Sequence, residues 1–118
     1  MIAKAQELKS VHAQTSTVRV ASTSPLILLR ENVDSIAILT LNRSEARNSL
    51  SEALLVALGD ALTEIAHERK VRAVVLAANG PAFSAGHDLK ELKNHRSDPD
   101  RGRAYFKYIM ELCSTVMQ

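Results

Sequence analysis

The feature that most constrains the fold is an amphipathic segment between two apolar ones. Residues 36–41 read IAILTL, a β-branched and apolar run that predicts a strand. Leucine and isoleucine then recur at helical spacing, which predicts a helix over 51–68. Residues 71–79 read VRAVVLAAN, a nearly continuous apolar run typical of a parallel strand buried on both faces. Strand, helix and strand form a βαβ unit with a right-handed crossover, so we expect an α/β fold.

Shorter elements flank this unit. A short apolar run at 26–30 is expected to pair with the first strand as a hairpin across a loop at 31–35. A further helix is predicted to begin at Asp88, and residues 94–103 form a charged segment that we expect to be a loop. Apolar residues at helical spacing predict a last helix over 104–118.

Two helix starts have capping patterns. Ser49 with Glu52 has the spacing of a capping box for the first helix, and Ser51 is an alternative cap. Asp88 with Glu91 has the same spacing at the second helix, so Asp88 is expected to be a helix cap rather than an acid or base.

Composition narrows the class of protein. The chain has 118 residues with 46% hydrophobic and 24% charged content, which predicts one small globular domain with a modest core. The net charge of +2 is too balanced to predict a nucleic-acid-binding face. No apolar run approaches the roughly 20 residues that a membrane-spanning helix needs, so no span is expected. The four histidines and Cys113 lack the spacing of a metal site, and Cys113 is predicted to lie in the core.

The first residues have a different composition. Residues 1–24 are rich in Ser and Thr and have no apolar block of the secretory type. We interpret them as a disordered extension or a targeting extension of the mitochondrial type. Pro25 ends this stretch, so the folded domain is predicted to cover 25–118.

A small-residue turn follows the second strand of the βαβ unit. Ser84, Ala85 and Gly86 lead directly to the helix at Asp88. Small residues let a ligand approach the backbone closely, and free N–H groups there suit a phosphate or a carbonyl oxygen that gains negative charge. Many βα turns look like this without binding a ligand, so both interpretations stay open on these grounds.

Three motifs resemble one family. AFSAGHDLKEL at 82–92 resembles the signature of the enoyl-CoA hydratase/isomerase (crotonase) superfamily. ARNSL at 46–50 and VRAVVLAANGPAF at 71–83 resemble two further motifs of that family, in the same order. The histidine in the first motif is similar to the enoyl-CoA hydratase domain-containing protein 3 group. The resemblance covers 26–118 and implies an incomplete fold: the N-terminal half of a ClpP/crotonase-type ββα superhelix.

The resemblance also implies a chemistry. Members bind an acyl-CoA thioester and hold its carbonyl oxygen with two backbone N–H groups, which stabilises an enolate-like state. By position, the N–H of His87 is the first of these donors. No cofactor is bound tightly, because coenzyme A enters as part of the substrate. The positions that match the family's CoA contacts are Ala46, Arg47, Ala85, Gly86, His87, Asp88, Leu89 and Lys90. Arg43, Arg47 and Lys90 are either phosphate contacts or solvated surface charges.

The chain also departs from the family pattern. Ser49 stands where the family usually has Ala, and His87 stands where it usually has Ala or Gly. The second donor, the catalytic glutamates and the helices that build the family's trimers or hexamers lie downstream, and no residue here matches them. We therefore expect this polypeptide to be inactive alone and marginally stable, with an exposed strand edge.

Three interpretations follow from these features. The chain is part of an enoyl-CoA hydratase or isomerase of fatty acyl-CoA metabolism, or a non-catalytic remnant that binds CoA or other subunits. The third is an unrelated α/β interaction domain. The family resemblance implies a cytoplasmic protein in a bacterium and a mitochondrial matrix protein in a eukaryote.

Overall fold

A computed structural model describes residues 26–118. Its elements in chain order are β1 (Leu28–Val33), β2 (Ile36–Leu41), the 3₁₀ turn η1 (Ser44–Ala46), α3 (Glu52–Ala66), β3 (Ala73–Ala78), α4 (Leu89–Asn94), the 3₁₀ turn η2 (His95–Ser97) and α5 (Arg103–Met117). The extension predicted for 1–24 lies outside the described residues.

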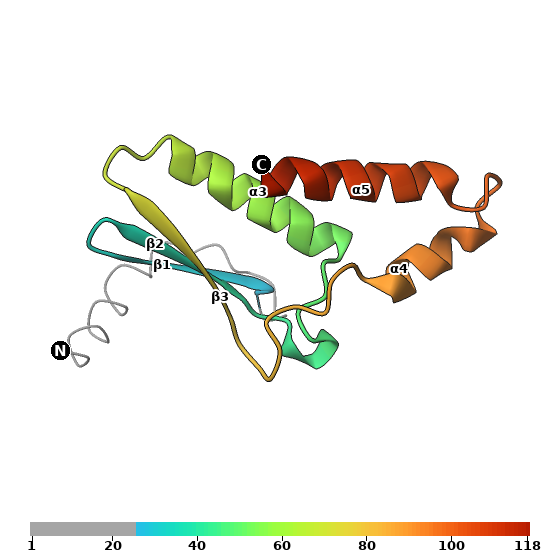
Figure 1. The fold of residues 1–118 in the computed structure, drawn as a ribbon, viewed down its shortest axis with the longest axis horizontal. Helices are drawn as coiled ribbons and strands as arrows, with labels where there is room; N and C mark the ends of the chain where they lie inside the picture. The colour runs from blue at the N-terminus through green and yellow to red at the C-terminus, as the bar shows by residue number, and fades with distance from the viewer. Residues whose placement is uncertain (1–25) are drawn as a thin grey trace.

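The three strands form one sheet in the order β1-β2-β3. β1 and β2 are antiparallel, and Val33 pairs with Ile36 across a turn in which Asp34 has φ 55°. The hairpin is therefore confirmed, but β1 runs to Val33 and the turn is tighter than the loop predicted over 31–35. Asp tolerates this left-handed conformation better than most residues. β2 and β3 are parallel and α3 connects them, which confirms the βαβ unit (Figure 1).

The core lies between the sheet and α3. Ala37, Leu39 and Leu41 alternate along β2 and are buried, as expected for one covered face of a strand. They pack against a stripe of α3 residues, which are Leu54, Leu58 and Ile65. Each large side chain buried in this way contributes about 1.5–3 kcal/mol relative to exposure. The periodicity of the sequence thus identifies the core of the βαβ unit correctly.

The prediction that β3 is buried on both faces is wrong. Val74, Val75 and Leu76 are 40%, 45% and 41% exposed. β3 is an edge strand of the described sheet, and α3 packs on the other two strands. An apolar strand with one open edge and exposed side chains is a surface that proteins normally cover. The exposed edge itself was expected from the sequence.

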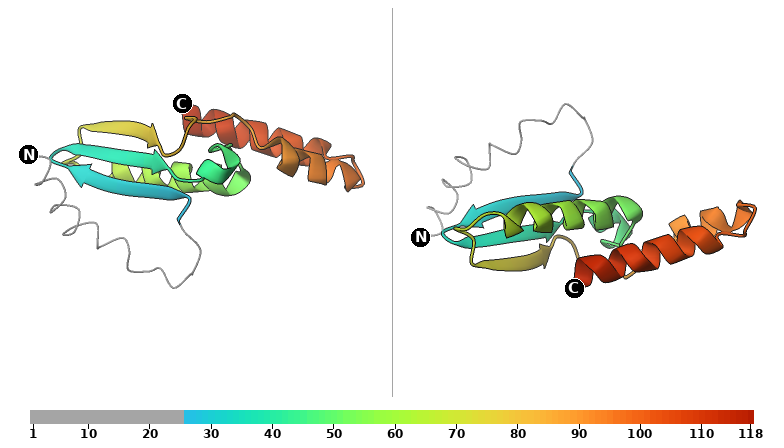
Figure 2. Two further views of the ribbon diagram at one scale, coloured as in Figure 1. Left: turned by 90° about the horizontal axis from the view of Figure 1, so that it is seen from below. Right: turned by 90° about the horizontal axis from the view of Figure 1, so that it is seen from above.

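α5 packs along α3 (Figure 1). A methyl group on Gly59 of α3 would lie 3.5 Å from the Val116 Cγ2 of α5, so the two helices approach closely there. Ile109 is the buried residue of α5, whereas Cys113 is only partly buried rather than a core residue. α4 and the start of α5 extend past the end of the sheet (Figure 2). No helix among residues 26–118 is long and apolar enough to cross a membrane.

The charged segment at 94–103 contains local structure. It contains η2 and then a turn, and the ring of His95 in η2 stacks on the ring of Tyr105 with centroids 3.6 Å apart. The segment is thus a structured corner between α4 and α5.

Candidate functional site

The site is built where the loop after β2 meets the turn after β3. Arg47 and Asn48 follow η1 with φ of 51° and 52°. Two successive left-handed residues reverse the chain direction sharply, and Asn is one of the few residues that adopt this conformation readily. The reversal places the backbone of 47–50 beside the turn at 84–88.

Asn48 is fully buried and connects three segments. Its Oδ1 accepts a hydrogen bond from the Arg43 N–H at 2.8 Å. Its Nδ2 donates to the carbonyl oxygens of Asn79 at 2.8 Å and Ala82 at 3.0 Å. One side chain therefore satisfies backbone groups before η1, at the end of β3 and in the following turn.

The turn at 84–88 is held to the loop by backbone hydrogen bonds. The Ala85 N–H donates to the Arg47 carbonyl at 3.0 Å, and the Leu50 N–H donates to the Gly86 carbonyl at 2.7 Å. The Asp88 N–H donates to the Leu50 carbonyl at 3.3 Å, which completes a parallel bridge between Leu50 and residue 87. Gly86 has φ 92°, a conformation that side-chain-bearing residues avoid.

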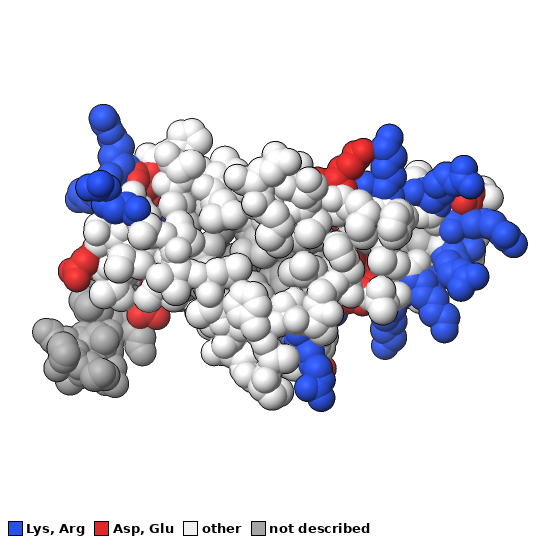
Figure 3. Space-filling model, viewed as in Figure 1, with Lys and Arg blue, Asp and Glu red and all other residues white. Residues whose placement is uncertain are grey.

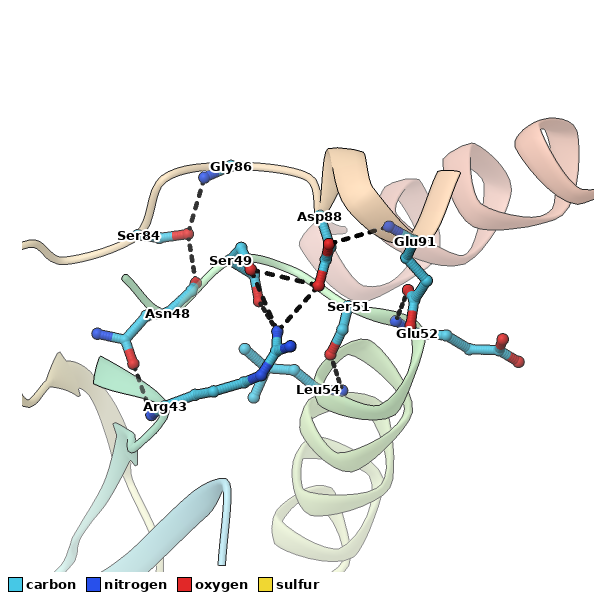
Figure 4. A network of polar contacts seen from close by, with 10 residues as sticks. All are labelled: Arg43, Asn48, Ser49, Ser51, Glu52, Leu54, Ser84, Gly86, Asp88 and Glu91. Atoms are coloured by element: carbon cyan, nitrogen blue, oxygen red, sulfur yellow. Dashed lines mark hydrogen bonds and ion pairs between the residues drawn. The ribbon is translucent and has the colours of Figure 1, made fainter. Parts of the chain in front are cut away.

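Ser84 fixes the turn from inside. Its hydroxyl donates to the Asn48 carbonyl oxygen at 2.8 Å and accepts from the Gly86 N–H at 3.1 Å (Figure 4). Gly86 is therefore held by two hydrogen bonds, to the Ser84 hydroxyl and from the Leu50 N–H, and Ser84 is itself bonded to Asn48, so the residue that follows Gly86 has a fixed backbone.

This arrangement leaves the backbone N–H of His87 free. In this parallel bridge the Gly86 carbonyl and the Asp88 N–H both bond to Leu50. The N–H of His87, which lies between them in the chain, therefore points away from Leu50. Among residues 26–118 no group accepts a hydrogen bond from the His87 N–H. Its side-chain Nε2 is buried, and within the described chain it also has no hydrogen-bond partner. A buried polar atom without a partner is uncommon and costly.

Asp88 has a structural role, as the sequence predicted. Its Oδ1 accepts from the Glu91 N–H at 3.1 Å and so caps α4, while its Oδ2 lies 3.1 Å from the Arg43 Nη1. Burial acts to raise the pKa of Asp88, but the hydrogen bonds from the Glu91 N–H and the Arg43 guanidinium outweigh it and hold this pKa below its usual value.

Arg43 is engaged in the same network. The same Nη1 contacts the Ser49 carbonyl oxygen at 3.3 Å and the Ser49 hydroxyl at 3.1 Å (Figure 4). The interpretation of Arg43 as a phosphate contact is therefore not supported, because its guanidinium already neutralises a carboxylate.

The start of α3 joins the network through Glu91. Ser51 is the N-cap, with its hydroxyl accepting from the Leu54 N–H at 3.2 Å, so the alternative cap is correct and the Ser49 capping box is not formed. The Glu91 carboxylate accepts from the Glu52 N–H at 2.8 Å and satisfies another free donor of that helix end.

Tyr105 of α5 also reaches this helix end. Its hydroxyl donates to the Glu52 carboxylate at 3.1 Å. Burial, followed by the hydrogen bond to Glu52 and the nearby charge of Glu91, raises the pKa of Tyr105 far above its usual value.

The predicted ligand-contacting residues lie together around this network. The exposed ones are Arg47, Ala85, Leu89 and Lys90, and the partly buried ones are Ala46, Gly86, His87 and Asp88. The sequence placed Ser84 in the turn, but it did not indicate that the side chains of Asn48 and Ser84 hold the turn in place. An Asn next to a predicted turn was the available signal for Asn48, because Asn is favoured at left-handed positions. Nothing in the sequence pairs Ser84 with the Asn48 carbonyl.

The other glutamates singled out in residues 26–118 form ion pairs instead of a second site. Glu64 and Glu68 both contact Arg30, and Glu111 lies 3.7 Å from Lys107. In the part of the chain that the structure describes, no cluster of three or more potential metal-ligating side chains is present.

The arrangement of strands, crossover helix and fixed turn matches that of known enzymes. The crystal structure of an enoyl-CoA hydratase from Mycobacterium smegmatis matches with a TM-score of 0.71 and 47% identity, covering 79% of this chain and 35% of that one. The crystal structure of human enoyl-CoA hydratase domain-containing protein 3 matches with a TM-score of 0.68 and 33% identity, covering 78% and 34%. The fold is therefore the N-terminal part of the crotonase fold.

Sequence comparison gives the family. The family model for enoyl-CoA hydratase/isomerase matches residues 31–117. The human mitochondrial enoyl-CoA hydratase domain-containing protein 3 is 35% identical over 85 residues, covering 72% of this chain and 26% of that protein. A putative enoyl-CoA hydratase of Mycobacterium tuberculosis is 40% identical over 80 residues, covering 64% and 25%. The chain belongs to the enoyl-CoA hydratase/isomerase family, and it spans about a quarter of the length of these curated relatives. The interpretation as an unrelated interaction domain is wrong.

Proposed function

We propose that this chain holds the thioester group of an acyl-CoA, with the backbone N–H of His87 as one donor of an oxyanion hole. The observation that supports the proposal most directly is that this N–H is free while the N–H groups of Ala85, Gly86 and Asp88 around it are all hydrogen-bonded. A donor in a fixed position needs no reorganisation when negative charge develops on a bound carbonyl oxygen.

The chemistry follows from that geometry. A hydrogen bond to the thioester oxygen stabilises the enolate-like state that forms when the carbon next to the carbonyl loses a proton, or when water adds to the β-carbon of an enoyl group and itself loses a proton. One donor of an oxyanion hole contributes about 3–4 kcal/mol to transition-state stabilisation, by comparison with enzymes in which such a donor has been removed. The hydrogen bonds of Ser84 and Asn48 would keep the donor in place, so they are positioning residues rather than catalytic ones.

The coenzyme is proposed to lie against the exposed residues around the turn. Arg47 and Lys90 are exposed cations in the described chain and suit phosphate groups, whereas Ala46, Ala85 and Leu89 offer small or apolar surface. Gly86 permits close approach of a ligand because a methyl group there would meet nothing within 4 Å. Asp88 contributes by fixing the start of α4.

Binding of an acyl-CoA and its hydration are expected to differ in this chain. We expect the 118 residues to bind an acyl-CoA but not to hydrate it, because they present one matched donor and none of the family's catalytic glutamates. Hydration of crotonyl-CoA by the purified chain above the rate of buffer alone would contradict this expectation.

The test of the donor uses a conjugated enoyl thioester of CoA whose absorption moves to longer wavelength when its carbonyl is polarised. His87→Pro removes the N–H, and breaks no hydrogen bond present among the described residues, so its loss of the spectral shift would support the proposal. His87→Ala is the matched control, because it removes the imidazole but keeps the N–H and should keep the shift. Equal shifts for both variants, with circular dichroism unchanged, would refute the role of this N–H.

A second candidate is a non-catalytic module that binds other subunits. The exposed strand β3 favours it, since Val74, Val75 and Leu76 present apolar surface at a sheet edge. Size-exclusion chromatography with and without acyl-CoA discriminates the two. Concentration-dependent association that is insensitive to acyl-CoA, together with no spectral shift, would favour the module.

A further inference from the structure

A groove lies between α4 and α5 next to the proposed thioester site, and it shares Leu89 with the surface proposed for the coenzyme. Its apolar floor is formed by Leu89, Leu92 and Phe106. Leu89 is 73% exposed and Phe106 is 53% exposed, so the floor is open to a ligand. The groove has a volume of about 600 Å³, which lies within the range of small-molecule sites.

Cations surround the far end of this groove. Four of its lining residues are basic, and they are Lys93, Arg96, Arg101 and Arg103. Figure 3 shows Lys and Arg side chains gathered over this end of the molecule, next to a broad uncharged surface. Within residues 26–118 none of the four takes part in an ion pair.

The acidic residues nearest in sequence are already engaged. The Asp98 carboxylate contacts the His95 Nδ1 at 2.8 Å. The Asp100 carboxylate accepts from the Gly102 N–H at 3.0 Å and the Ala104 N–H at 2.8 Å. These hydrogen bonds hold the pKa of Asp100 below its usual value, with the bond from Ala104 as the largest cause. The cations therefore stand without a dedicated carboxylate partner.

The corner that carries the cations is held by several contacts. His95 and Tyr105 stack with ring planes 9° apart, and Tyr105 is anchored to Glu52 of α3. Gly102 lies so close to the His95 carbonyl oxygen that an added methyl group would be 2.8 Å from it. A preformed groove loses less entropy on binding a ligand than a loop that must first become ordered.

The groove begins close along the chain to the proposed oxyanion donor. Leu89 lines the groove and begins α4, two residues after His87. From Leu89 to Asn94 the helix α4 rises roughly 8 Å, and η2 continues the chain to Arg96. An extended medium-length acyl chain has a comparable length. An acyl group whose thioester is held at His87 would thus run over the apolar floor toward the cations.

We infer that the site selects acyl chains that end in an anionic group, such as a carboxylate at the carbon farthest from the thioester. This inference rests on the proposed function and names its substrate class. The apolar floor suits the methylene chain, and the unpaired guanidinium groups suit a terminal carboxylate.

The test compares two CoA thioesters by titration calorimetry on the full 118-residue chain. They are octanoyl-CoA and the mono-CoA thioester of octanedioic acid, which differ only in the end of the acyl chain. We expect the second to bind about fivefold tighter or more, because each partly exposed ion pair changes affinity by only a few-fold. The preference should shrink as salt is raised.

Variants show whether the cations bind the end of the acyl chain or the phosphates of the coenzyme. Arg96→Gln, Arg101→Gln and Arg103→Gln together should abolish the preference while leaving octanoyl-CoA affinity unchanged. The matched control removes three exposed cations of the α3–β3 loop, with Arg69→Gln, Lys70→Gln and Arg72→Gln, and should keep the preference.

Three outcomes overturn the inference. Equal affinity for the two thioesters would refute it and leave the proposed function intact. Equal weakening of both by the triple variant would show that the cations bind the coenzyme phosphates instead. Failure of both thioesters to bind would refute the proposed function, and the inference with it.

Discussion

Replacement of Asn48 by Ala is the most informative perturbation of this fold. The side chain is fully buried and makes three hydrogen bonds, to the Arg43 N–H and to the carbonyl oxygens of Asn79 and Ala82. A buried group that loses its partner costs about 1–3 kcal/mol, and these groups are partly buried, so about 1 kcal/mol each is reasonable. Ala in the left-handed conformation that Asn48 adopts adds about 1 kcal/mol.

The sum is a loss of about 4 kcal/mol in the free energy of unfolding. That is most of the stability of a domain at the lower end of the usual range of about 5–15 kcal/mol, and a large fraction of it elsewhere in the range. We therefore expect Asn48→Ala to lower the urea midpoint drastically or to unfold the chain in buffer. Urea denaturation followed by circular dichroism at 222 nm measures the effect.

Asn48→Gly separates the cost of the lost hydrogen bonds from the cost of the left-handed backbone conformation. Gly relieves the left-handed strain but restores none of the hydrogen bonds, so it should be about 0.5–1 kcal/mol more stable than Asn48→Ala. A loss below about 1 kcal/mol for Asn48→Ala would refute the reasoning about buried partners. A glycine variant that is less stable than the alanine variant would refute the reasoning about the backbone.

Three further predictions concern single contacts. Asp88→Asn keeps the helix cap but loses the ion pair with Arg43, and should cost about 1 kcal/mol at pH 7. Because the pKa of Asp88 is lowered in the folded chain, the stability from the ion pair is fully present above the ordinary Asp pKa of about 3.9 and is lost as pH falls through the lower folded value. The difference in urea midpoint between variant and parent should therefore shrink as pH falls below about 3.9. Tyr105 has a raised pKa in the folded chain, so its contribution to stability is present below about pH 10 and lost at higher pH. Tyr105→Phe should flatten that alkaline loss in a thermal-melt series from pH 8 to 11, and an unchanged slope would contradict the assignment. Gly102→Ala should destabilise the fold by about 2 kcal/mol or more, since φ is 85° and a carbonyl oxygen lies 2.8 Å from the new methyl group. Gly59→Ala is its control in the same urea assay and should raise stability by about 0.5–1 kcal/mol, because the helix position has room for a methyl group 3.5 Å from a valine methyl. A change in the free energy of unfolding with the same sign for both variants would refute the argument.

The sequence alone determined the βαβ unit and the position of the turn. Leu54, Leu58 and Ile65 recur at the spacing that buries one face of α3, and the alternating residues of β2 bury one face of that strand. Helix caps are local as well, which is why the Asp88 cap was predictable from a few neighbouring residues.

The local sequence pattern gave wrong predictions for features that depend on residues far away in the chain. β3 has the composition of a strand buried on both faces, yet it is exposed because burial depends on what packs against a strand and not on its composition. The same limit applies to Arg43, whose partner Asp88 lies far along the chain. A basic residue in a motif cannot be assigned to a ligand or to an ion pair until its neighbours in space are known.

For the candidate site, too, one part was predictable from the sequence and another part was not. The sequence placed small residues in the turn and, by family resemblance, pointed to His87. Only the tertiary structure showed that its N–H is the free donor, because that depends on the bridge with Leu50 and on the Asn48 and Ser84 hydrogen bonds that fix Gly86. The groove with its cationic end was likewise invisible in the sequence, since Leu89 and Phe106 come together only when α5 folds back beside α4. Periodicity is a property of neighbouring residues, whereas a free donor or a groove is defined by contacts between segments that the chain brings together only on folding.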